Sequence, residues 1–174
     1  TGVDDAVVDG NIAYSIVTAA ATSTDPKYNN MNAADVSVTN NDNDTAGITV
    51  TPTSGLVTTE AGGTATFTIV LNTQPTANVS IGLSSSDLTE GTVSPSSVTF
   101  TSANWNTPQT VTVTGVDDAV VDGNIAYTIV TAAATSTDPN YSGLDPDNVS
   151  VTNNDNDTAG ITVTPTSGLV TTEA

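Results

Sequence analysis

The sequence contains no cysteine, no histidine and a single basic residue, Lys27, among its 174 residues. These absences exclude His-based triads, cysteine nucleophiles and Cys/His zinc sites. They also remove the basic surface that nucleic acids and anionic lipids require, and no apolar stretch approaches the roughly 18 residues of a membrane-spanning helix. We therefore expect a protein that is not an enzyme and that contacts neither nucleic acid nor membrane directly.

The residues that are present are acidic or suited to β-structure. Asp and Glu number 19, which gives a net charge of −18, yet 36% of the residues are hydrophobic. Thr and Val are abundant, and these residues favour pleated, half-exposed strands. Enough apolar residues remain for a modest β-core, so we expect a folded chain without disulfides.

An internal repeat organises the chain. Residues 1–61 recur at 114–174 with an offset of 113, and nine positions differ, which leaves 52 identities in 61. Eight of the nine differences fall in one window, 27–35 against 140–148, as in a tolerant surface loop between copied strands. We expect a window cut from a longer tandem array, with the C-terminal part of one repeat at 1–46, a complete repeat at 47–157 and the first strand of the next at 158–174.

Seven segments with period-two alternation predict strands, and none shows helical spacing. Seven short strands with Gly, Pro, Asn and Asp between them predict an all-β, immunoglobulin-like β-sandwich in each 113-residue repeat. The predicted strands are 48–52, 64–71, 78–83, 97–101, 110–116, 124–130 and 148–153. The predicted core residues are Ile48, Val50, Phe67, Ile69, Leu71, Val79, Ile81, Val98, Phe100, Val111, Val113, Ile125, Tyr127, Ile129, Val149 and Val151.

Following these strands up and down the sandwich sorts its loops into two ends. One end receives Trp105 and the variable loop at 140–148, and the other receives the acidic loops. The acids expected to converge there are Glu60, Asp87, Asp117, Asp118, Asp122, Asp155 and Asp157.

Such a cluster needs a counter-charge that the sequence does not supply. Two unit charges about 4 Å apart repel by ~4 kcal/mol at an effective dielectric of 20, and several pairs would rival a domain's stability of roughly 5–15 kcal/mol. A hard cation that accepts many oxygen ligands would offset this repulsion. Calcium fits better than magnesium, which prefers fewer protein oxygens and a stricter octahedron. The sequence therefore predicts bound calcium.

Other interpretations of these residues are available. Asp and Asn are ordinary turn formers, so each acidic motif alone is also explained as a loop. Asp87 and Glu90 resemble a glycosidase pair, but no aromatic platform accompanies them. Trp105, Tyr28 and Tyr141 invite a ligand-binding role, whereas closing the end of a core is the commoner use of such aromatic residues.

Three stretches resemble Calx-beta repeats, the immunoglobulin-like calcium-binding modules of sodium/calcium exchangers and of tandem arrays in bacterial surface proteins and adhesins. They are GITVTPTSGLVTTEAGGTATFTIVL (47–71), NWNTPQTVTVTGVDD (104–118) and NNDNDTAGI (153–161). The resemblance implies that the same seven acids ligate calcium, although Asn156 stands where exchanger modules have an acid. It extends this role to their counterparts in the leading copy, which are Asp4, Asp5, Asp9, Asp42 and Asp44.

Together these features predict a structural calcium-binding repeat of a long extracellular surface protein or secreted fibre. Its expected partners are calcium ions, neighbouring repeats of the same chain and neighbouring fibres, and calcium at each junction would stiffen the array. The alternative is an adhesion module whose variable loop or Trp105 end binds a glycan or a protein. An intracellular calcium regulator is disfavoured, because near-identical units suit an array better than a tuned sensor.

Overall fold

Eleven β-strands and no helix form the chain in the computed structural model, which describes all 174 residues. No helix of the length and apolar character needed to cross a membrane is found. The strands are β1 (Ile12–Ile16), β2 (Val36–Asn40), β3 (Ile48–Thr51), β4 (Leu56–Thr59), β5 (Thr64–Leu71), β6 (Val79–Ser85), β7 (Gly91–Ser94), β8 (Ser97–Phe100), β9 (Gln109–Gly115), β10 (Ile125–Thr131) and β11 (Val149–Asn154).

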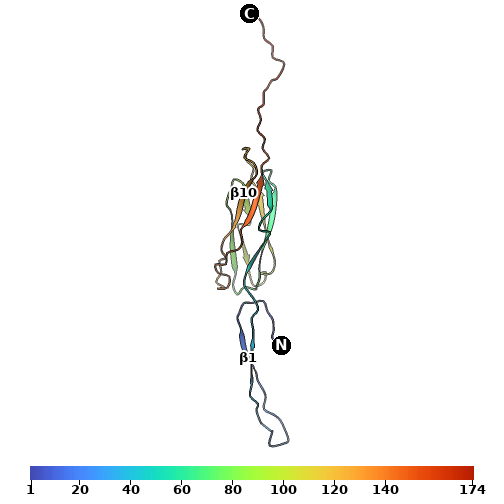
Figure 1. Cartoon of the computed structure of the whole chain (residues 1–174), viewed down its shortest axis with the longest axis vertical. Coiled ribbons are helices and arrows are strands. Elements are labelled where there is room, and N and C mark those ends of the chain that lie inside the picture. The colour runs from blue at the N-terminus through green and yellow to red at the C-terminus, as the bar shows by residue number, and fades with distance from the viewer.

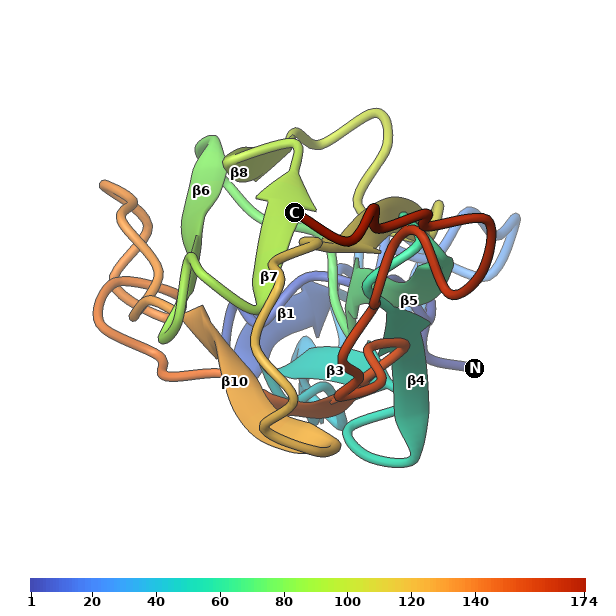
Figure 2. The same ribbon diagram turned by 90° about the horizontal axis from the view of Figure 1, so that it is seen from above.

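Strands β3 to β11 form two sheets that pack face to face. The first sheet has the order β4-β11-β10-β6-β8 and the second has the order β3-β5-β9-β7. Figure 2 looks along the sandwich and shows the strands surrounding a common interior. Neighbouring strands are antiparallel except β4 and β11, which run parallel. This is the immunoglobulin-like β-sandwich that the sequence predicts.

All seven predicted strands are present, and their bounds agree to within two residues. The sequence prediction missed β4 and β7, each four residues long. Gly55, with φ of 78°, turns the chain between β3 and β4, so that one predicted strand is followed by a second in the opposite sheet. This change of sheet brings the N-terminal part of the sandwich beside its last strand, β11.

Alternate residues of the facing strands fill the interior. Fourteen of the sixteen predicted core residues are buried, and the other two, Ile48 and Ile125, are half-buried. Ile48 packs against the edge of the core. Leu83, Ala134 and Tyr141 are buried as well, although the sequence analysis did not include them in the core.

The end that we call the aromatic end is closed by Tyr141 and Trp105. Tyr141 is 1% exposed, and its hydroxyl accepts the N–H of Thr73 at 3.1 Å and donates to the carbonyl of Thr73 at 2.7 Å. Asp138, also buried, accepts the N–H of Thr76 at 2.8 Å. Trp105 is half-buried and packs against the core. These aromatic residues close the core, as the sequence favoured.

The remaining segments leave the sandwich at opposite ends (Figure 1). Strands β1 and β2 form a separate hairpin whose register, Ile12 opposite Asn40, repeats that of β10 and β11 one period later. Residues 158–174 extend away from the sandwich and form no strand (Figure 1). Their assignment to neighbouring repeats stays a prediction.

Replacing Tyr141 with Phe should lower the free energy of unfolding by about 1–3 kcal/mol, because Thr73 loses buried hydrogen-bond partners. Urea unfolding measures this change. The matched control is Tyr28→Phe, the same position in the leading copy, where the side chain is 61% exposed; there we expect a change below about 0.5 kcal/mol. Equal effects of the two substitutions would contradict this role for Tyr141.

Candidate metal centre

The other end of the sandwich, which we call the acidic end, brings together loops that are far apart in sequence. Strand β4 ends beside the end of β11, where Thr59 lies opposite Asn154, and β9 ends beside the start of β5. The loops that leave these strands contain residues 60–63, 116–124 and 155–157. Antiparallel and parallel pairing together therefore gather three acidic loops at one place.

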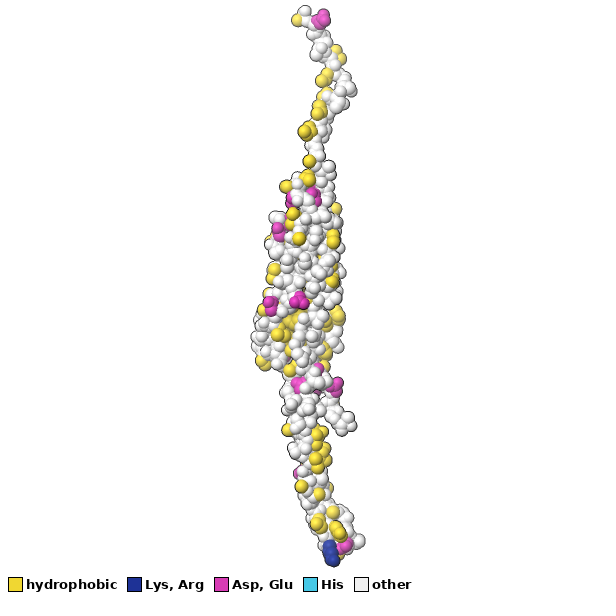
Figure 3. Space-filling model, in the orientation of Figure 1, with side chains coloured by type: hydrophobic (Ala, Val, Ile, Leu, Met, Phe, Trp, Pro, Cys, Tyr) yellow, Lys and Arg dark blue, Asp and Glu magenta, His cyan; other side chains and the backbone are white.

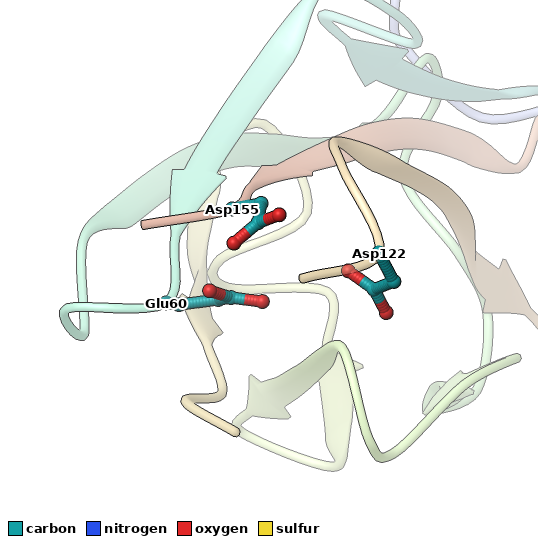
Figure 4. Close-up of side chains that lie close together, drawn as sticks. All are labelled: Glu60, Asp122 and Asp155. Carbon is teal, nitrogen blue, oxygen red and sulfur yellow. The ribbon is translucent and has the colours of Figure 1, made fainter. Parts of the chain in front are cut away.

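Glu60, Asp122 and Asp155 form the first group of carboxylates, with one oxygen from each lying within 4.8 Å of the others. Figure 4 shows the three side chains approaching one another from separate segments of the chain. Glu60 is only 2% exposed, whereas Asp155 is half-buried and Asp122 is exposed. The group is therefore open to solvent on one side.

A second group joins the first through a shared member. Oxygens of Glu90, Asp118 and Asp122 also lie within 4.8 Å of one another, so Asp122 belongs to both groups. The carboxylate of Asp118 accepts the N–H of Val120 at 2.6 Å, which makes it a turn former as well as a member of the group.

Asp117 and Asp157 lie at the border of these groups. The side-chain amide of Asn156 donates to Asp117 at 3.2 Å, and the N–H of Asp157 donates to Asp155 at 2.7 Å. The Oδ2 atom of Asp157 is buried and has no hydrogen-bond partner. We call the seven acids at this end the carboxylate cluster; they are Glu60, Glu90, Asp117, Asp118, Asp122, Asp155 and Asp157.

Six of the seven acids predicted to converge thus do so, and Asp87 does not. Its carboxylate accepts the hydroxyl of Thr89 at 2.6 Å and the N–H of the same residue at 3.0 Å. These bonds hold the pKa of Asp87 below its usual range, the hydroxyl first and then the N–H. The side chain therefore forms a local turn, which is the ordinary role of Asp in a loop.

Glu90 occupies the position in the cluster that the sequence analysis gave to Asp87. It is 5% exposed and accepts the side-chain amide of Asn153 at 3.3 Å. Asn153 in turn accepts the hydroxyl of Thr58 at 3.0 Å, and that hydroxyl lies 3.1 Å from the hydroxyl of Tyr127. Buried polar side chains thus connect Glu90 to the interior of the sandwich through a chain of hydrogen bonds.

A sequence pattern shared by the glutamates could have indicated that Glu90 belongs to the cluster. The chain has three glutamates, and each follows Thr and precedes Ala or Gly, as in TTEA at Glu60 and LTEG at Glu90. Both Glu60 and Glu90 stand at the end of the sandwich where one strand finishes or the next begins. This common context distinguishes them from the aspartates, which also occupy turns throughout the chain.

Hydrogen bonds and repulsion act on the acids of the cluster in opposite directions. The N–H groups of Asp157 and Gly123 lower the pKa of Asp155. Burial raises the pKa of Asp157, and the charges of Asp155 and other neighbouring aspartates raise it further. The N–H of Asn156 lowers the pKa of Glu60, but burial and the surrounding carboxylates outweigh it, so the net direction is upward.

The leading copy repeats the local geometry of these loops. Asp42 accepts the N–H of Gly10 at 2.7 Å and the N–H of Asp44 at 2.9 Å, as Asp155 accepts those of Gly123 and Asp157. The predicted acids of this copy line a cavity of about 300 Å³; they are Asp4, Asp5, Asp9, Asp42 and Asp44. Local hydrogen bonds therefore shape this part of the site without a complete sandwich around it.

No basic side chain lies in the carboxylate cluster. Figure 3 shows acidic side chains near both ends of the sandwich, while the single Lys side chain lies at the far tip of the hairpin. Carboxylate oxygens are the donors that a hard divalent cation prefers, and the unpartnered Oδ2 of Asp157 is a donor that the protein itself does not use. The residues therefore fit calcium, and Asn156, next to the cluster, offers a carbonyl oxygen.

No protein-family model and no curated protein matches the sequence. Among solved structures, the chain is similar to the periplasmic chaperone SfaE, with 9% identity and a TM-score of 0.48 over 68% of this chain and 61% of that one. It is similar to an apo-form Calx CBD1 domain, with 13% identity and a TM-score of 0.47 over 64% of this chain and 96% of that one. Domains 4 and 5 of the S-layer protein SbsC match with 21% identity and a TM-score of 0.37 over 71% of this chain and 59% of that one. Identities this low do not transfer function.

Replacing Asp157 with Asn should raise the melting temperature of the metal-free protein at pH 7. The raised pKa of Asp157 means that the folded protein holds this proton to higher pH than the unfolded chain does, so stability is lost as pH rises through the folded pKa. At about pH 3 residue 157 is protonated in both the folded and the unfolded state, so the rise in melting temperature should vanish. Calorimetry in chelator at the two pH values measures this difference.

Asp44→Asn is the control for this experiment, because Asp44 has the corresponding place in the leading copy, outside the sandwich. It should leave the melting of the sandwich unchanged at both pH values. A gain for Asp157→Asn that is equal at pH 3 and pH 7 would show that charge repulsion is not its cause.

Proposed function

We propose that the sandwich is a calcium-binding structural module of a long extracellular protein or fibre, in which bound calcium stiffens the junction between successive units. The module has no catalytic role in this proposal. Its partners are calcium ions, neighbouring units of the same chain and neighbouring fibres.

One observation supports this proposal above the others: seven carboxylates share one end of the sandwich, and no base accompanies them. Turn formation alone explains Asp87, whose carboxylate bonds only within its own loop. It does not explain Glu60 and Glu90, which are buried and approach other carboxylates. Burying a carboxylate beside another is unfavourable unless a cation or a proton compensates it.

Glu60, Asp122 and Asp155 would hold one ion, and Glu90 and Asp118 would extend the site through the shared Asp122. Calcium would supply positive charge to the cluster and would fix the loops that contain these acids relative to one another. The chain leaves the sandwich directly after Asp157, so fixing that loop also fixes the direction in which the next segment departs (Figure 1).

The adhesion alternative has less support. Tyr141 is buried and its hydroxyl is already hydrogen-bonded, while Trp105 packs against the core. Tyr141 is therefore engaged inside the sandwich, and Trp105 is partly covered by its contact with the core.

Calcium should raise the melting temperature of the chain by about 10 °C over chelator. An ion that binds only the folded state stabilises it by about 2.7 kcal/mol at a hundredfold excess over Kd, and for a unit of this size each kcal/mol is worth roughly 4 °C. Magnesium at the same concentration should give a smaller shift, because it prefers fewer protein oxygens. Superimposable melting curves in calcium and chelator would refute the proposal.

The variant Asp122→Asn should weaken calcium affinity by about tenfold or more, since it removes the carboxylate that both groups share. Asp122 is a better target than Asp118, whose carboxylate also holds Val120. The exposed Asp147 lies outside the cluster, so Asp147→Asn is the matched control and should leave the affinity unchanged. Titration calorimetry measures both.

An array of three or more units should be more extended in calcium than in chelator. The segment 153–160 is too short for a free linker, and its acids belong to the cluster of the preceding unit. Small-angle scattering should therefore show a larger and narrower distribution of end-to-end distances when calcium is present. Identical scattering in the two conditions would exclude calcium as the stiffening element.

A further inference from the structure

The sequence Ala-Val-Val occurs between the acids of both copies, at residues 6–8 and at 119–121, and we call each of these segments the valine loop. The two loops share one local bond: Val7 donates its N–H to Asp5 at 2.9 Å, and Val120 donates its N–H to Asp118 at 2.6 Å. Their surroundings differ. Val120 and Val121 are 58% and 54% exposed, whereas Val7 and Val8 are half-buried.

The loop at 6–8 is half-buried because it lies against the aromatic end of the sandwich. The carbonyl of Ala6 accepts the N–H of Gln74 at 2.7 Å. The carbonyl of Val8 accepts the side-chain amide of Asn140 at 3.1 Å. Gln74 and Asn140 come from two separate loops, so the valine loop spans both of them.

The surface that receives the valine loop is firmly held. Gln74 lies between two residues that are held by hydrogen bonds. Thr73, on one side, is bonded to the hydroxyl of Tyr141. Thr76, on the other side, donates its N–H to the carboxylate of Asp138. Asn140 follows Asp138 closely and donates its own N–H to the same carboxylate at 2.9 Å. The two donors are thus presented by one rigid network at the aromatic end.

We infer that the valine loop is a docking element through which the acidic end of one unit seats on the aromatic end of a following copy. In the complete unit the valine loop is the exposed segment 119–121. The partner that would cover it is a second copy of this chain, through the surface formed by Gln74 and Asn140. The contact seen for residues 6–8 is the same interaction one period earlier in the chain.

The sequence difference at this surface preserves its chemistry. Lys27 occupies the position of Asn140 in the leading copy, and both side chains end in N–H donors. A carbonyl such as that of Val8 accepts from either. The variable loop therefore changes its residue at the docking position without losing the donor. The two hydrogen bonds of the docking contact use backbone carbonyls of the valine loop, and no carboxylate takes part in them.

The first test measures hydrogen exchange of the Gln74 amide by NMR in the 174-residue chain, in chelator. The double variant Val7→Asp/Val8→Asp should accelerate this exchange about fivefold or more, because charged side chains oppose burial of the loop and release the bond to Ala6. The matched control, Val120→Asp/Val121→Asp, alters the copy that has no unit seated on it and should leave Gln74 unchanged. Equal exchange of Gln74 in the two double variants overturns the proposal.

The amide of Thr73 reports folding in the same spectra, since it donates to Tyr141 within the sandwich. It should stay protected in every variant. Asn140→Asp replaces the donor with an acceptor and should also accelerate exchange of Gln74, whereas Asn140→Lys, which introduces the residue of the other copy, should not. The reverse order of these two variants contradicts the proposal.

The second test uses the absence of cysteine from the chain. Val8→Cys combined with Asn140→Cys should be joined within one chain by a short bifunctional maleimide. Val121→Cys combined with Asn140→Cys is the control, because residue 121 is the same position of the loop at the opposite end of the sandwich. Mass spectrometry of the digested chain should find the cross-linked peptide in the first pair alone, and equal cross-linking of both pairs refutes docking.

Discussion

Seven carboxylates share the acidic end of the sandwich with no basic side chain among them, and their mutual repulsion opposes the strand pairing that brings them together. The loops resist this repulsion with backbone donors: Gly123 and Asp157 donate to Asp155, and Asn156 donates to Glu60. These bonds lower the pKa of Asp155, but the pKa values of Glu60 and Asp157 remain raised. Hydrogen bonds therefore compensate the repulsion within the cluster only in part, and this is the reason that we propose a bound cation.

The aromatic end of the sandwich is closed by hydrogen bonds, and its one buried carboxylate, Asp138, has no other carboxylate in its hydrogen-bond network. The hydroxyl of Tyr141 and the carboxylate of Asp138 each satisfy backbone groups of the facing loop at 73–76. Here burial raises the pKa of Asp138, but the N–H groups of Thr76 and Asn140 outweigh it, and the net direction is downward. The aromatic end is therefore held by hydrogen bonds within the protein, whereas under our proposal the acidic end also needs bound calcium.

Alternation predicted most of the fold because the inward residues of the long strands are apolar, as Phe67, Ile69 and Leu71 are in β5. It missed β4, whose inward Thr58 is polar yet fully buried, and β7, where a glycine takes the place of an inward side chain. The position of the acidic loops followed from strand direction alone. The direction of each side chain could not be predicted in this way. Asp87 and Glu90 lie three residues apart in one loop, and only local hydrogen bonds decide which of them joins the cluster.

Because β4 pairs with β11, which is far away in the sequence, β4 can pair with the wrong strand while the chain is being synthesised. Val57 lies opposite Thr152, so the sandwich is incomplete until its last strand has emerged from the ribosome. The segment 36–41, however, has the same sequence as 149–154, VSVTNN, and precedes β4 by only a short stretch of chain. Nascent β4 therefore meets a copy of its partner before the partner itself exists. Strand exchange between adjacent copies is the expected misfolding route of such a chain, and its frequency should fall as the copies diverge.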